Sequence, residues 1–175
     1  MRQIFYKGRK MKNLVLLSAV AATLFMAGCS SKEPVVDSNK DGFTNADTMS
    51  EAERLNALIN KIQSQVETVY FDFDKFNIKS SEQGKIGTNA MLFNQSGAES
   101  LKVLVEGNCD EWGSDEYNYA LGVKRAKAAK EALIAQGVSA DRIEIKSNGE
   151  GMPVCTERTK ACDAQNRRDE FKVMQ

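Results

Sequence analysis

The sequence predicts an α/β fold: a two-layer sandwich of order β-α-β-α-β-β, with its helices on one face of the sheet and a flexible tether in front. Two observations predict this fold. From residue 67 onward, short segments of alternating apolar residues take turns with longer segments of helical periodicity. Residues 30–49 are polar and turn-rich, while the apolar content of the whole chain, 42%, is enough for one packed core.

A first helix is expected from Ser50 to about Gln65, ahead of the sandwich. Ser50 and Glu53 have the spacing of a capping box, in which each side chain bonds the backbone N–H of the other residue. We expect this helix to pack on the main domain rather than on a partner, because its apolar residues fall on one side: Leu55, Leu58, Ile59 and Ile62.

The sandwich begins with a half-buried strand at residues 69–73, where valine and two phenylalanines alternate with polar residues. A helix follows over residues 80–94 and is capped by Ser80 or Ser81. These two segments are the first βα unit of the predicted pattern.

The second unit is a strand at residues 101–105 and a long helix that Ser114 caps and Gly137 ends. A third strand is expected at residues 142–147. After a long loop, residues 171–173 form the fourth strand.

The composition excludes several classes of function. The chain has 24 basic and 24 acidic side chains, no histidine and four cysteines. This balance does not favour a nucleic-acid partner. Without histidine there is no Ser-His-Asp or Cys-His catalysis and no histidine-ligated zinc or haem. We expect no cofactor and no metal, and the chain is not expected to be an enzyme.

Residues 1–28 have a different character from the rest. They hold five basic side chains and no acid, and residues 14–28 form an apolar run too short to span a bilayer as a helix. This pattern is typical of a secretory signal peptide, the alternative being a buried core helix. Met11 would serve as a start as well as Met1. Removal of the signal leaves 147 residues with 19 basic and 24 acidic side chains, a net charge near −5.

The segment Met26-Ala27-Gly28-Cys29 resembles the lipobox of bacterial lipoproteins, with methionine in place of the more usual leucine. The resemblance implies that the signal is cleaved before Cys29 and that Cys29 is lipidated. Stable anchoring needs more than one acyl chain, which such lipoproteins carry. Because Ser30 follows rather than aspartate, the resemblance implies the outer membrane, with the domain facing the periplasm.

Three regions follow from these features: the signal at residues 1–28, lipidated Cys29 with the tether and short helix at residues 29–66, and the folded domain at residues 67–175. Residues 37–42 of the tether imitate the start of a calcium-binding EF-hand loop. Position twelve of that loop would be Thr48 instead of glutamate, so we interpret the segment as a turn.

One residue of the long helix does not match its surroundings. On a helical wheel Arg125 lies in the middle of the apolar arc. A buried guanidinium needs an anion, and Asp110 in the loop before the helix is the nearest candidate. Either the two form an ion pair that ties the loop to the helix, or they face a shared ligand. Such a ligand would offer an ammonium group to Asp110 and a carboxylate to Arg125.

Residues 67–175 resemble the OmpA-like peptidoglycan-binding domain, and the lipobox and tether fit its lipoprotein subtype, the peptidoglycan-associated lipoproteins (Pal). The resemblance rests on four segments in the same order and spacing: 69–74 (VYFDFD), 105–113 (VEGNCDEWG), 116–126 (EYNYALGVKRA) and 166–168 (NRR). It implies a mixed sheet. In that family the residues matching Asp110 and Arg125 bind the zwitterionic end of diaminopimelate in the stem peptide.

The resemblance adds four further residues to the expected peptidoglycan site: Asn108, Asn118, Arg167 and Arg168. Of the two arginines, one is expected to support the pocket and the other to face solvent. Three residues of the pocket loop depart from the family pattern. Asn108 replaces a histidine, Cys109 a small residue and Trp112 an arginine or polar residue. We interpret Trp112 either as a rim aromatic against the glycan or a partner, or as loop packing.

The resemblance implies a non-enzymatic anchor that holds the outer membrane to peptidoglycan and works with the Tol proteins, TolA and TolB, during cell division. The alternative is a peptidoglycan hydrolase with paired carboxylates, such as Asp72 or Asp74 with Asp110 or Glu111. A stator-type relative would need a retained transmembrane helix, which the cleavage site at Cys29 argues against.

The periplasm is oxidising, so disulfides are allowed there. We expect a disulfide between Cys155 and Cys162, which would stabilise the fold by roughly 2.5 kcal/mol in the chain-entropy model. Cys109 then stays free beside the pocket. In the rival arrangement Cys109 pairs with Cys155 or Cys162.

Overall fold

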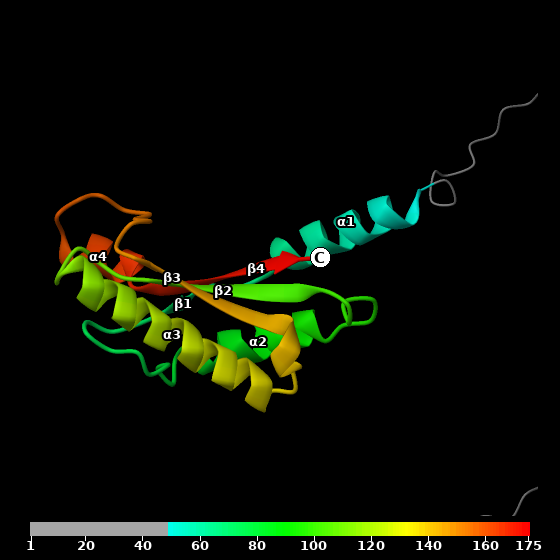
Figure 1. Cartoon of the computed structure of the whole chain (residues 1–175), viewed down its shortest axis with the longest axis horizontal. Coiled ribbons are helices and arrows are strands. Elements are labelled where there is room, and N and C mark those ends of the chain that lie inside the picture. Colours follow the sequence, from blue (N-terminus) through cyan, green and yellow to red (C-terminus); the bar gives the residue numbers. More distant parts are fainter. Residues whose placement is uncertain (1–48) are drawn as a thin grey trace, which may run out of the picture. The chain divides into compact units, whose positions relative to one another are not determined.

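A computed structural model of the chain describes residues 49–175. The expected signal peptide, Cys29 and nearly all of the tether lie outside the described residues. The elements, in chain order (Figure 1), are α1 (Glu51–Gln63), β1 (Val69–Tyr70), α2 (Gln83–Phe93), β2 (Lys102–Asn108), α3 (Asp115–Ala135), the 3-10 turn η1 (Ala140–Arg142), β3 (Ile143–Gly149), α4 (Lys160–Asn166) and β4 (Arg168–Met174).

The four strands form one mixed sheet in the order β1-β4-β2-β3. β2 and β3 run parallel, and β4 is antiparallel to both β1 and β2. In this register Val105 of β2 lies between Ile145 of β3 and Phe171 of β4. The predicted fold class and mixed sheet are therefore confirmed.

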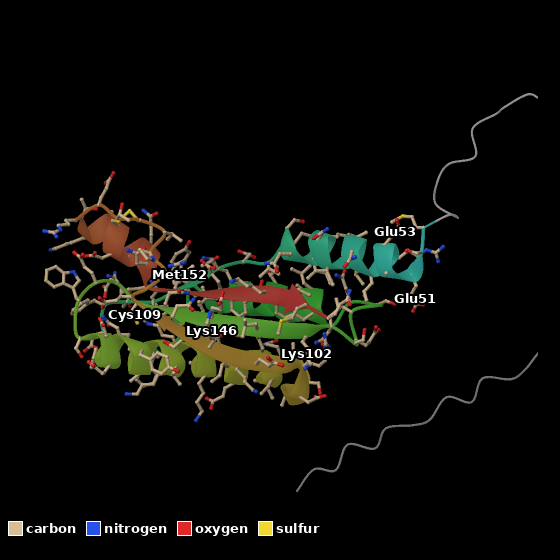
Figure 2. The ribbon with its side chains drawn as sticks, turned by 45° about the horizontal axis from the view of Figure 1, so that its top comes forward. Glu51, Glu53, Lys102, Cys109, Lys146 and Met152 are labelled. Atoms are coloured by element: carbon tan, nitrogen blue, oxygen red, sulfur yellow. A yellow bond between two sulfur atoms is a disulfide. The ribbon has the colours of Figure 1, made fainter. Side chains whose placement is uncertain are left out.

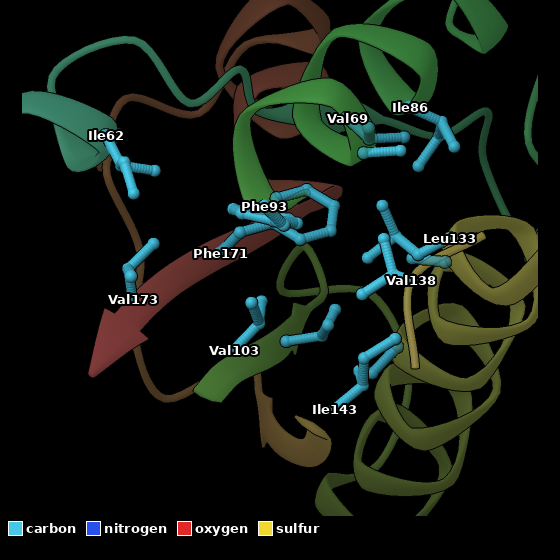
Figure 3. Close-up of a cluster of buried hydrophobic side chains, with 14 of the residues drawn as sticks. Ile62, Val69, Ile86, Phe93, Val103, Leu133, Val138, Ile143, Phe171 and Val173 are labelled. Atoms are coloured by element: carbon cyan, nitrogen blue, oxygen red, sulfur yellow. The ribbon is translucent and has the colours of Figure 1, made fainter. Parts of the chain in front are cut away.

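α2 and α3 lie side by side over one face of the sheet, and the core fills the space between the two layers (Figure 3). Alternate residues of β2 and β4 point into it because successive side chains of a strand face opposite sides. The core side chains run from Leu55 to Val173. Residues 49–175 therefore contain a core of their own.

The opposite face of the sheet carries charges. The Glu106 carboxylate lies 3.1 Å from Lys146 and 2.5 Å from Lys172, on the two neighbouring strands, and its side chain is only 4% exposed. Burial raises the pKa of Glu106, but its bonds to the two lysines outweigh that effect and the pKa is lowered. This cross-strand triplet stabilises a sheet face that needs no covering layer.

α1 lies along the exposed edge of β4 and begins with the predicted capping box of Ser50 and Glu53. Because β1 is short, the second half of β4 has no neighbouring strand on that side. The Gln63 side chain takes its place: its amide nitrogen donates to the Phe171 carbonyl at 2.9 Å, and its oxygen accepts from the Val173 N–H at 2.9 Å. The helix thus satisfies a strand edge that would otherwise be open to another chain.

Three expected elements differ in the structure. The first strand ends at Tyr70, because the chain turns at Asp74, which has a φ of 56°, and leaves Phe73 60% exposed. α2 begins at Gln83 rather than at residue 80. Ser80 and Ser81 do not cap it. The N-cap residue is Glu82, whose side chain makes no capping bond and accepts from the Tyr70 N–H of β1.

The third difference is α4, which lies where a long loop was expected. Its N-cap is Thr159, whose hydroxyl accepts from Cys162 N at 3.2 Å. Within residues 49–175, no helix is long and apolar enough to cross a membrane.

Candidate functional site

Three loops meet at one end of the sheet (Figure 1). They are the loop after β2, which leads through residues 109–114 into α3; the loop after β1; and the turn from α4 into β4. Of the six residues expected in the peptidoglycan site, Asp110 and Arg167 lie on these loops. The other four lie next to them in strands or in α3: Asn108, Arg168, Asn118 and Arg125. The fold thus brings together segments that are far apart in the chain.

Asp110 pairs with Arg167 at this end. A guanidinium nitrogen of Arg167 lies 2.8 Å from Oδ2 of Asp110, and the two side chains are 13% and 5% exposed. Arg167 also donates to the Phe71 carbonyl at 3.1 Å. The residues of the described range form no other hydrogen bond to this carboxylate, so Oδ1 is free for a ligand donor.

Arg125 is completely buried, as its place on the helical wheel predicted. It makes no ion pair with Asp110 in the described structure, so the ion pair considered from the sequence is wrong. The guanidinium instead donates to backbone carbonyls: Lys75 at 2.9 Å, Asn108 at 2.7 Å and, through Nη2, Asp72 at 3.4 Å.

These contacts explain how the buried charge is tolerated. Carbonyl dipoles replace the expected carboxylate, and the guanidinium carbon lies 5.2 Å from the centre of the Phe71 ring, a cation–π distance. Burial lowers the pKa of Arg125, while nearby Cys109, Asp169 and Asp110 oppose that effect. Arg125 therefore fixes the loop after β1 against the loop after β2.

Asn108 and Asn118 are buried and hold the loop after β2 in place. The Asn108 amide donates to the Glu106 carbonyl at 3.0 Å and accepts from Asn148 at 3.0 Å. The Asn118 amide donates to the Asp110 carbonyl at 3.3 Å and to the carboxylate of Glu150. These bonds give both residues supporting positions, although the Asn118 Oδ1 is buried without a hydrogen-bond partner among the described residues.

The two neighbouring arginines have different roles. Arg167 supports the pocket through Asp110, as expected of one of them. Arg168 does not face solvent, and that expectation is wrong: the residue is only 4% exposed, and its guanidinium lies 2.6 Å from Glu170 and donates to the Met152 carbonyl at 3.1 Å. Successive residues of β4 point to opposite faces, and this one is covered by the loop after β3.

A cavity of about 240 Å³ opens beside Asp110. Its other lining residues are Phe73, Asp74, Trp112, Gly113, Tyr117 and Leu121. The Tyr117 hydroxyl donates to Asp74, and this bond raises the pKa of Tyr117. Asp74 and Asp110 thus line the same cavity together with the aromatic side chains of Phe73, Trp112 and Tyr117.

Sequence reasoning missed Asp169. Its side chain is fully buried, and neither carboxylate oxygen has a hydrogen-bond partner among the described residues. Burial raises its pKa well above the ordinary value, although Arg125 nearby acts in the other direction. The alternation of β4 was the available signal, because Asp169 shares a face with Phe171 and Val173.

The cysteines follow the expected arrangement. Cys155 and Cys162 form a disulfide, and Cys109 is free and buried at the end of β2 (Figure 2). The rival pairings of Cys109 are therefore wrong. Burial raises the pKa of the Cys109 thiol to about 11. No cluster of side chains suited to a metal ion occurs in residues 49–175.

The OmpA family model matches residues 70–167, more than half of the chain. The chain belongs to the OmpA family. Two relatives in this family are both named peptidoglycan-associated lipoprotein. The one from Pasteurella multocida is 34% identical and covers 91% of this chain and 96% of its own length. The one from Haemophilus influenzae is 36% identical and covers 90% and 94%.

One solved structure agrees with this OmpA-family assignment, and a second shares the fold. The crystal structure of the peptidoglycan-associated lipoprotein from Burkholderia pseudomallei has a TM-score of 0.58 and 36% identity, and covers 61% of this chain and 89% of that one. The C-terminal domain of Helicobacter pylori MotB has a TM-score of 0.57, covering 63% and 85%, but only 18% identity. The likeness to MotB concerns the fold alone.

Proposed function

We propose that this chain is an outer-membrane lipoprotein that binds peptidoglycan non-covalently and anchors the membrane to the wall. Two things support the proposal: the family, with its relatives named peptidoglycan-associated lipoprotein, and the site. The observation that carries it is Asp110, a nearly buried carboxylate with one oxygen held by Arg167 and the other free at a cavity.

The ligand group proposed for this cavity is the zwitterionic end of diaminopimelate. Its ammonium would bond the free Oδ1 of Asp110, and a charge-assisted bond of this kind is stronger than a neutral one. Its carboxylate would bond Arg125. Nη2 of Arg125 is the available donor, because its only bond in the described structure is the long one, 3.4 Å, to the Asp72 carbonyl.

Arg125 is covered, so this contact requires the loop after β1 to yield. The loop is held to Arg125 by its Asp72 and Lys75 carbonyls. A ligand carboxylate would take over the weaker of these bonds, while the bond to Lys75 at 2.9 Å holds the guanidinium in place. Asn108, Asn118 and Arg167 support the site in this proposal, and Arg168 supports it from the other side of β4.

The remaining parts of the proposal concern the rest of the chain. Residues 1–28 are the signal, residues 29–66 contain the lipidated Cys29 and the tether, and residues 67–175 are the binding domain. Many copies on one membrane facing one polymeric wall give avidity even where a single contact is weak. In this role the protein would work with the Tol proteins in envelope constriction during cell division.

The test is calorimetric binding of a diaminopimelate-containing muropeptide to residues 49–175. The variant Asp110→Asn keeps the shape and removes the charge, and we expect it to weaken binding by roughly 10- to 150-fold, the value of a hydrogen bond to a charged group. The matched control is Asp115→Asn, an exposed acid at the start of α3. Equal affinity in wild type and Asp110→Asn would overturn the site.

The same samples separate the hydrolase alternative. Asp74 and Asp110 line one cavity, as paired carboxylates would. Mass spectrometry of the muropeptide after incubation should find it intact. Cleavage that Asp74→Asn abolishes would favour the hydrolase.

For the lipid anchor, Cys29→Ala should release the protein from the membrane fraction, and its retention there after signal removal would contradict the anchor.

A further inference from the structure

Two large aromatic side chains project into solvent beside the Asp110–Arg167 pair. Phe73, in the loop after β1, is 60% exposed, and Trp112, in the loop after β2, is 59% exposed. A single exposed apolar side chain needs no explanation. These two come from different loops and line the same two cavities, so they form a shared surface.

The two cavities are neighbours. The first is the cavity of about 240 Å³ that contains Asp110. The second, of about 300 Å³, is lined by Phe73, Trp112, Lys160, Asp163 and Arg167. Phe73 and Trp112 belong to both, and Arg167 of the second pairs with Asp110 of the first. A ligand seated at Asp110 can therefore continue into the second cavity.

The indole of Trp112 is fixed in position. Its N–H donates to Oδ2 of Asp163 in α4 at 3.0 Å. α4 is itself held by the Cys155–Cys162 disulfide. A tryptophan used only for loop packing would be covered, whereas this one stays largely exposed. A ring that is already immobilised loses little conformational entropy when a ligand contacts it.

The second cavity combines an apolar wall with polar groups of both kinds. Lys160 and Arg167 donate hydrogen bonds, and Asp163 accepts them. A sugar ring has the matching chemistry, with C–H bonds on its faces and hydroxyl groups around its edge. Asp163 already accepts from Trp112 and Arg167 already pairs with Asp110, but an apolar peptide would cover the Lys160 ammonium without giving it a partner, at a cost. A volume of about 300 Å³ is at the lower end for small-ligand sites.

We propose that this second cavity, formed by Phe73, Trp112, Lys160, Asp163 and Arg167, binds an N-acetylated sugar of the glycan to which the stem peptide is attached. The inference rests on the proposed function, since the stem peptide in the Asp110 cavity brings the sugar to the aromatic pair. The aromatic rings contact the C–H face of the sugar, and the polar side chains bond its hydroxyl and acetamido groups.

Trp112 is the only tryptophan of the chain, which makes the inference directly measurable. The protein is titrated with two ligands: a disaccharide-peptide that contains diaminopimelate, and the same peptide without sugars. We expect the disaccharide-peptide to bind about tenfold more tightly, the effect of one buried aromatic anchor. It should also shift the tryptophan emission more than the free peptide does.

Calorimetry on variants then shows which residues give the gain in affinity from the sugars. Trp112 and Phe73 also line the Asp110 cavity, so their removal is judged by the difference between the two ligands. Trp112→Ala should weaken the disaccharide-peptide about tenfold more than it weakens the free peptide, and Phe73→Ala should act in the same direction. The matched control is Tyr119→Ala, because Tyr119 is also 59% exposed but lines a different cavity. Thermal unfolding of each variant checks that its fold is kept.

The outcomes separate the two proposals. If the free peptide binds and the sugars add nothing, the sugar site is wrong and the proposed function stands. If Trp112→Ala weakens both ligands equally, the tryptophan contacts the peptide and the sugar site is again wrong. If neither ligand binds, both proposals fail.

Discussion

Arg167 pairs with Asp110 at 2.8 Å although 57 residues separate them in the chain. The pair joins the loop that leads into α3 to the turn that leads from α4 into β4. Arg125, one candidate ion-pair partner of Asp110 from the sequence, instead donates to the carbonyls of Lys75 and Asn108 and so holds the loop after β1 against the end of β2. The site thus has a nearly buried charge pair and a fully buried arginine that holds the loop after β1 in place.

The disulfide should matter for stability because it closes the segment before Arg167. Replacing both Cys155 and Cys162 by serine is expected to lower the free energy of unfolding by about 2–3 kcal/mol, the chain-entropy effect of a short ring. Chemical denaturation of residues 49–175 measures this. Unchanged stability would mean that the segment is held by its other contacts alone.

Cys109 should be inert in the folded protein. Its thiol is buried, and burial raises its pKa to about 11, so hardly any reactive thiolate exists at neutral pH. In residues 49–175 a thiol reagent should label no cysteine before denaturation and one afterwards. Rapid labelling of the native protein would contradict the buried position of Cys109.

Asp169 should cost stability at neutral pH. Its raised pKa means that its contribution is most favourable below the ordinary aspartate pKa and is lost as the pH rises through the folded value. Asp169→Asn removes the charge and keeps the shape, so we expect it to stabilise the fold by about 1–3 kcal/mol at neutral pH. The advantage should shrink in acid. Parallel stability curves for wild type and variant across this pH range would contradict the raised pKa of Asp169.

Glu106 should show the opposite dependence. Its pKa is lowered by Lys172 and Lys146, so its contribution is present above the ordinary glutamate pKa and is lost as the pH falls through the folded value. Glu106→Gln should destabilise the fold by about 1–3 kcal/mol at neutral pH, since two lysines lose their partner. Exposed Glu144, paired with Lys102 on the same face, offers the matched control Glu144→Gln, with a smaller effect.

Much of the fold could be predicted from the sequence because its segments have clear hydrophobic periodicity. The apolar arc of α3 predicted the burial of Arg125, and the capping box predicted the start of α1. α4 could not be read in this way. It buries only Cys162 and Asn166, so its sequence has no apolar stripe that would predict a helix.

The sequence predicted which residues lie together at the candidate site but not how they pair. Asp110, Arg125 and Arg167 were all expected there. Which arginine faces Asp110 depends on how the loop after β1 passes over Arg125, and its carbonyl contacts have no pattern in the sequence. Asp169 could not be predicted for a different reason. Strand alternation predicts that it is buried, as it is, whereas a charged side chain is usually exposed.

The most direct test of the central claim changes the ligand and leaves the protein intact. Calorimetry compares two muropeptides that differ only at the third residue of the stem, diaminopimelate in one and lysine in the other. Lysine keeps the ammonium for Asp110 and lacks the carboxylate for Arg125. We predict that the lysine form binds roughly 10- to 150-fold more weakly, and that Asp110→Asn weakens both forms. Equal binding of the two forms by the wild-type protein would contradict recognition of diaminopimelate at this site.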